Sequence, residues 1–172
     1  MKYFILLSAL ALTLTLSSCG GNAENLKESD YAPDFTLQDA DGNSYSLSSY
    51  KGISPVVIYF YPKAGTPGCT KQACGIRDNW SKFSENGIVV LGISVDSKED
   101  IKEFILENNL NFPLLSDSNK EVSKAYGVLN NLGLASRITF VVDKEGKIAE
   151  IIREVDVQKH ADQVFDIAMK LK

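Results

Sequence analysis

Two continuous apolar runs indicate buried strands in the middle of the chain. Residues 56–61 (VVIYFY) and 88–95 (IVVLGISV) contain mainly β-branched, aliphatic and aromatic side chains and no charge. Such runs are typical of strands that are covered on both faces of a sheet. Residues 69–85 lie between them and predict one amphipathic helix, because four apolar side chains share one helical stripe: Ala73, Ile76, Trp80 and Phe83.

Two segments predict β-hairpins, the first from alternating polar and apolar residues and the second from two strands on either side of a turn. The first joins residues 34–37 to residues 44–47 through an Asp-Gly turn. The second joins a strand at 138–142 to a strand at 147–153 through the turn DKEG. Aromatic residues in the apolar runs are expected to form the core or a pocket wall.

Helical spacing of apolar residues predicts three further helices. One covers residues 98–109, with Asp96 and Ser97 as its cap, a short one covers 119–126, and the last begins near Val157. The expected order of elements is β-β-β-α-β-α-α-β-β-α. This order predicts an α/β domain layered around a mixed sheet.

The start of the chain differs from the rest. Lys2 precedes an apolar run at 4–16, which is shorter than the roughly 20 residues of a membrane-spanning helix and has the length of a signal-peptide core. The run ends in Leu-Ser-Ser-Cys19, which resembles the lipobox of bacterial lipoproteins. We therefore expect Cys19 to be lipidated; the alternative is a plain secretory signal in which Cys19 is incidental.

These features divide the chain into three parts. We expect a lipoprotein signal peptide at 1–18, a flexible polar tether at 19–30, and a single domain at 31–172. The protein would then be exported and lipid-anchored to a bacterial membrane in the cell envelope. The net charge of −4 comes without a basic block, which argues against nucleic acid as a partner.

Two cysteines remain where the strand at 56–61 leads into the predicted helix. Cys69 begins that helix, where unpaired backbone amides and the helix dipole favour a thiolate, and the Thr66 hydroxyl could donate to it. Cys74 follows five residues later, which in an ideal helix separates the Cα atoms by roughly 8.7 Å. A disulfide needs less than about 7 Å, so a Cys69–Cys74 bond requires the first turns to unwind. Two structural thiols or a static disulfide are the alternatives.

The same segment resembles the active-site signature of peroxiredoxins. Pro62, Thr66 and Cys69 have its spacing, and YFYPKAGTPGCTKQAC resembles the bacterioferritin-comigratory-protein, or peroxiredoxin Q, branch. APDFTL at 32–37 and RITFVVDKEG at 137–146 resemble two further landmarks of that branch. The resemblance covers about residues 31–172.

This resemblance implies a thioredoxin-like fold of the peroxiredoxin type and a thiol peroxidase without a cofactor or metal. Cys69 would attack hydrogen peroxide or an organic hydroperoxide, and Cys74 would convert the sulfenic acid into an intramolecular disulfide. Thr66 and Arg137 would orient the peroxide. A thioredoxin-like dithiol protein would reduce the disulfide. The substrate pocket would be shaped by Pro62, Pro67 and Gly68.

The sequence also departs from the branch. An acidic residue is common at the position of Ala64 or Gly65, Glu at that of Gln72, and Pro or Gly at that of Ser136. These differences leave open how the start of the helix adjusts the reactivity of Cys69. A monomer is expected, because the resolving cysteine is in the same chain.

Several residues have plainer interpretations. Thr66 could simply cap the helix, Arg137 could be a surface or ion-pairing residue, and Arg77 is interpreted as structural. His160 is the only histidine and is expected to be solvated or packed. With a single histidine, a Cys-His protease or a conventional zinc site has little support.

Three other functions remain open. A thiol–disulfide oxidoreductase of the envelope would have Cys-x-x-Cys, whereas the spacing here is Cys-x4-Cys. A copper-binding protein on the same fold would have Cys-x3-Cys and a suitably placed histidine. A non-catalytic lipoprotein domain could hold a static disulfide.

Overall fold

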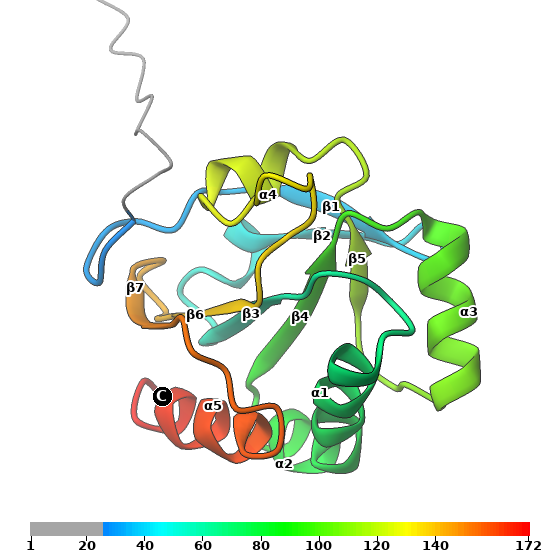
Figure 1. Cartoon of the computed structure of the whole chain (residues 1–172). Helices are drawn as coiled ribbons and strands as arrows, with labels where there is room; N and C mark the ends of the chain where they lie inside the picture. Colours follow the sequence, from blue (N-terminus) through cyan, green and yellow to red (C-terminus); the bar gives the residue numbers. More distant parts are fainter. Residues whose placement is uncertain (1–25) are drawn as a thin grey trace, which may run out of the picture.

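The computed structural model describes residues 26–172 (Figure 1). The predicted signal peptide, Cys19 and residues 19–25 of the predicted tether lie outside the described residues. The next residues are bonded to the domain: the Ser29 amide donates to the Ile148 carbonyl over 2.8 Å, and the Ile148 amide donates to the Asp30 carbonyl over 2.9 Å. Residues 26–30, predicted to belong to the tether, therefore lie against the sheet. In the range 26–172, no helix has the length and apolar character needed to cross a membrane.

A mixed sheet forms the centre of the domain. Its strands are β1 (Thr36–Asp39), β2 (Ser44–Ser46), β3 (Val56–Phe60), β4 (Val89–Ser94), β5 (Leu114–Ser116), β6 (Ile138–Val142) and β7 (Ile148–Ile152). They lie in the order β2-β1-β5-β4-β3-β6-β7. Strand β3 pairs in parallel with β4 and antiparallel with β6. Every residue of β3 is buried, as its apolar run predicts.

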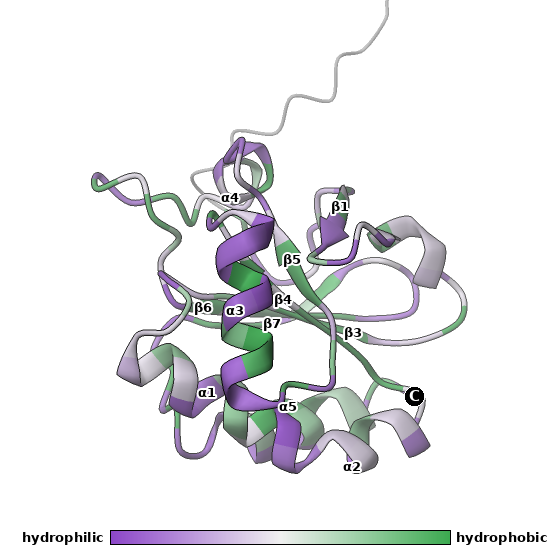
Figure 2. Cartoon of the chain, turned by 90° about the vertical axis from the view of Figure 1, so that its right-hand side faces the viewer, coloured by the Kyte–Doolittle hydropathy of each residue, from purple (hydrophilic) through white to green (hydrophobic). Residues whose placement is uncertain are grey.

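Helices cover both faces of the sheet (Figure 1). They are η2 (Leu47–Tyr50), α1 (Pro67–Asp78), α2 (Trp80–Glu85), α3 (Lys98–Asn108), α4 (Glu121–Ala125) and α5 (His160–Met169). One core cluster joins the sheet to α1, α2, α3 and α5, and a second joins its other face to η2 and α4. Figure 2 shows the result, with hydrophobic central strands and an α3 that alternates between hydrophilic and hydrophobic residues. The structure is the thioredoxin-like fold that was predicted.

The structure departs from the predicted elements at several places; among them, η2 was not predicted and α5 begins at His160, not near Val157. Strand β5 was not predicted, because three residues after Pro113 are too few to show periodicity. The helix predicted at 69–85 is broken at Asn79, where the backbone leaves helical geometry and the side-chain amide donates to the Gly75 carbonyl over 2.9 Å. Only Ser97 caps α3, with its hydroxyl accepting from the Asp100 amide; Asp96 has a different role.

The register of β3 and β6 determines where the cysteine segment lies. Phe60, the last residue of β3, pairs with Ile138, the first residue of β6. The residues that follow Phe60 and the residue that precedes Ile138 therefore meet at one edge of the sheet. This is the edge at the carboxyl ends of the parallel strands, where ligand sites are common in α/β folds.

Candidate active site

Cys69 is the third residue of α1 and is only 2% exposed. Pro67 at the first helical position suits the helix start, because its fixed φ is helical and no amide proton is needed there. Gly65 takes a φ of +73°, which glycine adopts without steric cost and which turns the chain from β3 into α1. The sulfur thus lies in the first turn of α1, beneath the loop that follows β3.

Arg137 reaches Cys69 from the other side of this edge. Its Nη2 donates to the Cys69 sulfur over 3.3 Å, and its Nη1 donates to Oε1 of Gln72. A β-carbon at position 68 would lie 3.1 Å from Nη2, so Gly68 leaves room for the guanidinium. The guanidinium thus holds a positive charge against the sulfur. Arg137 is therefore not the surface arginine of the plainer interpretation.

The other predicted site residues lie in the same loop and helix. Thr66 precedes α1, but its hydroxyl makes no capping bond; it donates to the Lys63 carbonyl over 2.9 Å. Pro62 is half-buried and Pro67 is exposed. Within residues 26–172, no hydrogen bond joins Thr66 to Cys69. The structure therefore brings Arg137 and Gly68 to the sulfur, and leaves the Thr66 hydroxyl engaged in its own loop.

Cys74 is a free thiol on the same helix. It is half-buried, whereas Cys69 is buried, and α1 is continuous between them. The described form is therefore the reduced one, with its helix intact.

Arg77, interpreted as structural, donates to Asp78 over 2.8 Å and to the Asn108 carbonyl over 2.6 Å.

Three buried polar residues continue from Arg137 into the core, and the sequence analysis did not identify them as a group. Gln72 Nε2 lies 3.3 Å from Nδ1 of His160, and Oγ1 of Thr139 lies 2.8 Å from Nε2 of His160. All three are at most 1% exposed. His160 was expected to be solvated or packed, and it is packed. Its spacing from Val164 and Ala168, by four and eight residues, was the signal that it faces inward.

Comparison with known proteins agrees with this arrangement. Residues 29–151 match the AhpC/TSA family. The chain belongs to the AhpC/TSA family. The peroxiredoxin Bcp of Escherichia coli is 40% identical over 148 residues, which are 82% of this chain and 94% of the relative.

Solved peroxiredoxin structures resemble the domain closely. Peroxidoxin BcpB of Mycobacterium tuberculosis has a TM-score of 0.79 and 36% identity, covering 86% of this chain and 99% of that chain. The bacterioferritin comigratory protein of Xanthomonas campestris, whose structure concerns alkyl peroxide reduction, has a TM-score of 0.72 and 31% identity, covering 79% and 90%. The chain is thus a thiol peroxidase of the peroxiredoxin Q/Bcp type.

Asp96 holds the active-site loop of this peroxiredoxin in place. It follows β4, is 8% exposed, and its Oδ2 accepts a hydrogen bond from the Ala64 amide over 2.8 Å. Its own carbonyl accepts from the Ser116 hydroxyl over 2.7 Å, which links the loop to the end of β5. The loop before Cys69 is therefore tied through Asp96 to the carboxyl ends of β4 and β5. The backbone amide of Ala64 makes this link, so no acidic side chain is needed at position 64.

Burial keeps the aromatic and imidazole groups under the site neutral. Burial, with a further contribution from the positive charge of Arg137, lowers the pKa of His160 from 6.5 to about 4. Burial likewise raises the pKa of Tyr59 and of Tyr61. At neutral pH, Arg137 is therefore the charged group in contact with the Cys69 sulfur.

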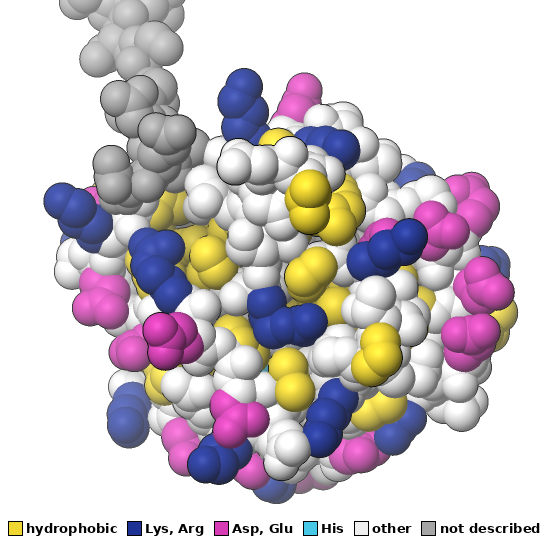
Figure 3. All heavy atoms as spheres, viewed as in Figure 1, with side chains coloured by type: hydrophobic (Ala, Val, Ile, Leu, Met, Phe, Trp, Pro, Cys, Tyr) yellow, Lys and Arg dark blue, Asp and Glu magenta, His cyan; other side chains and the backbone are white. Residues whose placement is uncertain are grey.

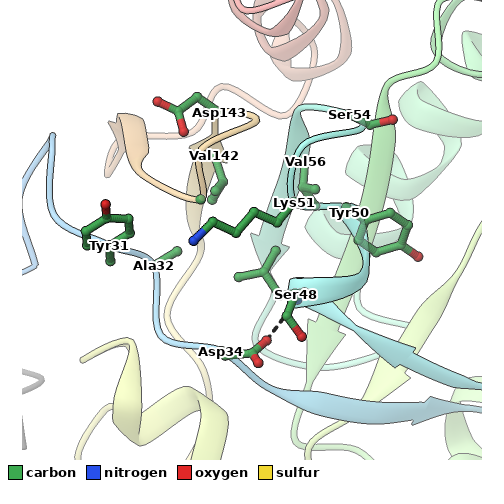
Figure 4. Close-up of a pocket in the computed structure, with 12 residues that line it drawn as sticks. Tyr31, Ala32, Asp34, Ser48, Tyr50, Lys51, Ser54, Val56, Val142 and Asp143 are labelled. Atoms are coloured by element: carbon green, nitrogen blue, oxygen red, sulfur yellow. Dashed lines mark hydrogen bonds between the residues drawn. The ribbon is translucent and has the colours of Figure 1, made fainter. Parts of the chain in front are cut away.

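A pocket of about 210 Å³ lies at the opposite end of the same strands (Figure 4). Val56 and Val142, which pair there, line it. Lys51 extends through it, with Nζ 5.4 Å from the centre of the Tyr31 ring. Its lining contains no cysteine, so this hollow is separate from the thiol chemistry. The face seen in Figure 3 shows hydrophobic side chains interspersed with charged side chains of both signs.

Proposed function

We propose that Cys69 is the peroxidatic cysteine of this thiol peroxidase and that Arg137 activates it. The observation that carries the proposal is the hydrogen bond from Arg137 Nη2 to the Cys69 sulfur, inside a site where the sulfur is 2% exposed. A thiolate is the reactive form of cysteine, and a neighbouring guanidinium stabilises it.

In the first step, the Cys69 thiolate attacks the terminal oxygen of the peroxide. A sulfur–oxygen bond forms, the O–O bond breaks, and the departing alkoxide or hydroxide takes up a proton. Cys69 is oxidised to the sulfenic acid, and the peroxide is reduced to alcohol or water. Arg137 stabilises the negative charge on the departing oxygen, because its second nitrogen is already held by Gln72 and its position is fixed.

Thr66 completes the proposed peroxide site from the loop side. Its hydroxyl must exchange the Lys63 carbonyl for a peroxide oxygen when substrate binds. Rotation about one side-chain bond is sufficient for this exchange. Pro62, Pro67 and Gly68 form the surrounding wall.

In the second step, the Cys74 thiol attacks the Cys69 sulfenic acid, a disulfide forms, and water leaves. The intact α1 keeps the two residues five positions apart along the helix, so the first turns unwind before the sulfurs meet. A dithiol protein then reduces the disulfide by exchange and is itself oxidised. Both cysteines belong to one chain, so we propose that a monomer completes the cycle.

We propose hydrogen peroxide and organic hydroperoxides as substrates. The Xanthomonas relative, whose structure concerns alkyl peroxide reduction, supports the organic class. We further propose that the protein is exported and anchored by lipid at Cys19 to a bacterial membrane. The apolar run, the lipobox-like LSSC and the polar segment after it support this location. An exported enzyme needs a thioredoxin-like reductant in the same compartment.

The central experiment compares the two cysteine variants. Cys74→Ser should consume one equivalent of peroxide and stop with a sulfenic acid on Cys69, which mass spectrometry after dimedone trapping detects. Cys69→Ser should consume none. Peroxide consumption by Cys69→Ser at the wild-type rate would overturn the assignment. For the anchor, growth with labelled palmitate should label the wild type and not Cys19→Ser; equal labelling would contradict lipidation at that residue.

A further inference from the structure

The hydrogen-bond partners of the buried polar residues behind Arg137 constrain where their protons lie. Arg137 nitrogens can only donate, so the Gln72 atom that faces Nη1 must be the amide oxygen. The amide nitrogen of Gln72 then faces His160, at 3.3 Å from Nδ1 and 3.5 Å from Nε2. Because that nitrogen is also a donor, and Nε2 already has Thr139 Oγ1 as a closer partner, the geometry favours Nδ1 as the acceptor for the Gln72 amide. The tautomer that gives each ring nitrogen its own partner is therefore Nε2–H, with Thr139 Oγ1 as the acceptor at 2.8 Å.

We propose that His160 is a positioning residue for the peroxidase reaction: as the neutral Nε2–H tautomer, it fixes the amide of Gln72, and Gln72 in turn holds Arg137 on Cys69. This inference rests on the proposed roles of Cys69 and Arg137. His160 does not touch the reacting atoms. Its contribution is to prevent the Gln72 amide from turning over, which would bring two donors, the Gln72 amide and Arg137, face to face.

The surroundings of His160 favour this neutral form. The imidazole is 0% exposed and is the first residue of α5, where the helix dipole disfavours a positive charge. The guanidinium of Arg137 is the cation that acts on it, and the ring of Tyr59 packs edge-on at 5.8 Å between centroids. A protonated imidazole would place a donor on Nδ1 opposite the Gln72 amide.

The arrangement also explains why an amide suits position 72. A carboxylate there would form an ion pair with Arg137 and divide its charge between two partners. It would also attract a proton to Nδ1 of His160. The neutral amide instead holds the guanidinium with an oxygen and leaves its positive charge for the Cys69 thiolate and the departing oxygen.

The single histidine makes the proton position directly measurable. In untagged, reduced full-length protein labelled with ¹⁵N-histidine, the two ring nitrogens give one pair of signals. We expect the Nε2–H tautomer alone at neutral pH. Gln72→Glu should move a proton onto Nδ1. An Nδ1–H tautomer or an imidazolium in the wild type, or unchanged nitrogen signals in Gln72→Glu, would overturn the proposal.

Two matched variants test the link to the reaction. His160→Asn offers an amide oxygen near the place of Nδ1, whereas His160→Phe fills the same space without an acceptor. In stopped flow with hydrogen peroxide, we expect His160→Phe to lower the second-order rate constant about tenfold and His160→Asn to recover most of it. Equal rate constants for the two variants would exclude positioning through Gln72.

The two arms separate this inference from the proposed function. The nitrogen spectra use the wild type and Gln72→Glu and need no peroxidase activity. Thermal unfolding of each variant shows whether it is folded; if both histidine variants fail to fold, the wild-type tautomer and its response to Gln72→Glu still decide. If the wild type does not react with peroxide while the tautomer is as expected, the proposed function fails and the hydrogen-bonded chain stands.

Discussion

The two ends of strands β3 and β6 differ in what they bury. At the Phe60–Ile138 end, polar side chains are buried and bonded to one another around a thiol. At the Val56–Val142 end there is an open pocket, and its lysine lies over an aromatic ring. We call the Phe60–Ile138 end, which holds the proposed peroxidatic cysteine, the reactive end. It is marked by mutually bonded buried polar groups, whereas the pocket with open volume lies at the other end.

The largest effect should come from removing the nucleophile at the reactive end. Cys69→Ser should abolish peroxide consumption, because serine cannot replace the thiolate at neutral pH. Lys51→Ala, at the other end, should leave the rate constant unchanged. Stopped-flow measurement with hydrogen peroxide checks both. A large loss in Lys51→Ala would mean that the two ends are coupled and would break the comparison.

Replacing the cation at the reactive end should have the next largest effect. Arg137→Lys keeps a positive charge but cannot bond to both Cys69 and Gln72, so we expect the rate constant to fall roughly a hundredfold. The matched change at the other end of the strands is Lys147→Arg. In the wild type, Nζ of Lys147 also lies over the Tyr31 ring. This change should have no effect on the rate constant. Similar rate constants for Arg137→Lys and wild type would show that charge alone is sufficient.

The reactive end should also carry a distinct dependence of stability on pH. The pKa of His160 is lowered to about 4, so between pH 6.5 and pH 4 the unfolded chain binds a proton that the folded chain does not. The free energy of unfolding should therefore decrease as pH falls through this window, by on the order of 3 kcal/mol from this group. Urea unfolding of wild type and His160→Phe should show the smaller slope in the variant. Equal pH dependence in the two proteins would mean that a group other than His160 takes up the proton on unfolding.

The smallest effect should come from crowding the guanidinium. Gly68→Ala places a methyl group 3.1 Å from Arg137 Nη2, so the side chain must shift slightly away from Cys69. We expect the rate constant to fall about threefold. Gly75→Ala is the control in the same helix, because its methyl group would have only ordinary contacts, at 3.9 Å from Ala161. A larger loss in the control would show that the helix, not Arg137, is responsible.

Much of the fold could be predicted from local pattern. The strand at 138–142 was predicted with the bounds that the structure gives, because a run of β-branched and aromatic residues followed by the turn DKEG is typical of a strand. The break at Asn79 depends on a hydrogen bond from a side chain to a backbone carbonyl. The apolar stripe continues past this residue, so the sequence pattern predicts an unbroken helix. Strand β5 depends on pairing with its neighbours, which three residues do not reveal.

The site was predictable only as far as its motif extends. Cys69 and Arg137 could be found because they lie in two recognisable segments. Asp96, Thr139 and His160 could not be assigned, because each acts through a partner that is distant in the sequence. The polar Thr139 inside an otherwise apolar strand was a visible irregularity, and a buried polar group requires a partner.

Gln72 lies in α1 between the two cysteines, and this placement bears on the reduction potential of the proposed disulfide. Unwinding that lets the sulfurs meet also removes Gln72 from His160 and from Arg137. Those contacts therefore stabilise the dithiol form alone. A couple whose dithiol is favoured in this way has a higher potential, by about 30 mV for each 1.4 kcal/mol. The bonds that prepare Cys69 for peroxide would thus also make the oxidised enzyme a ready electron acceptor for its reductant.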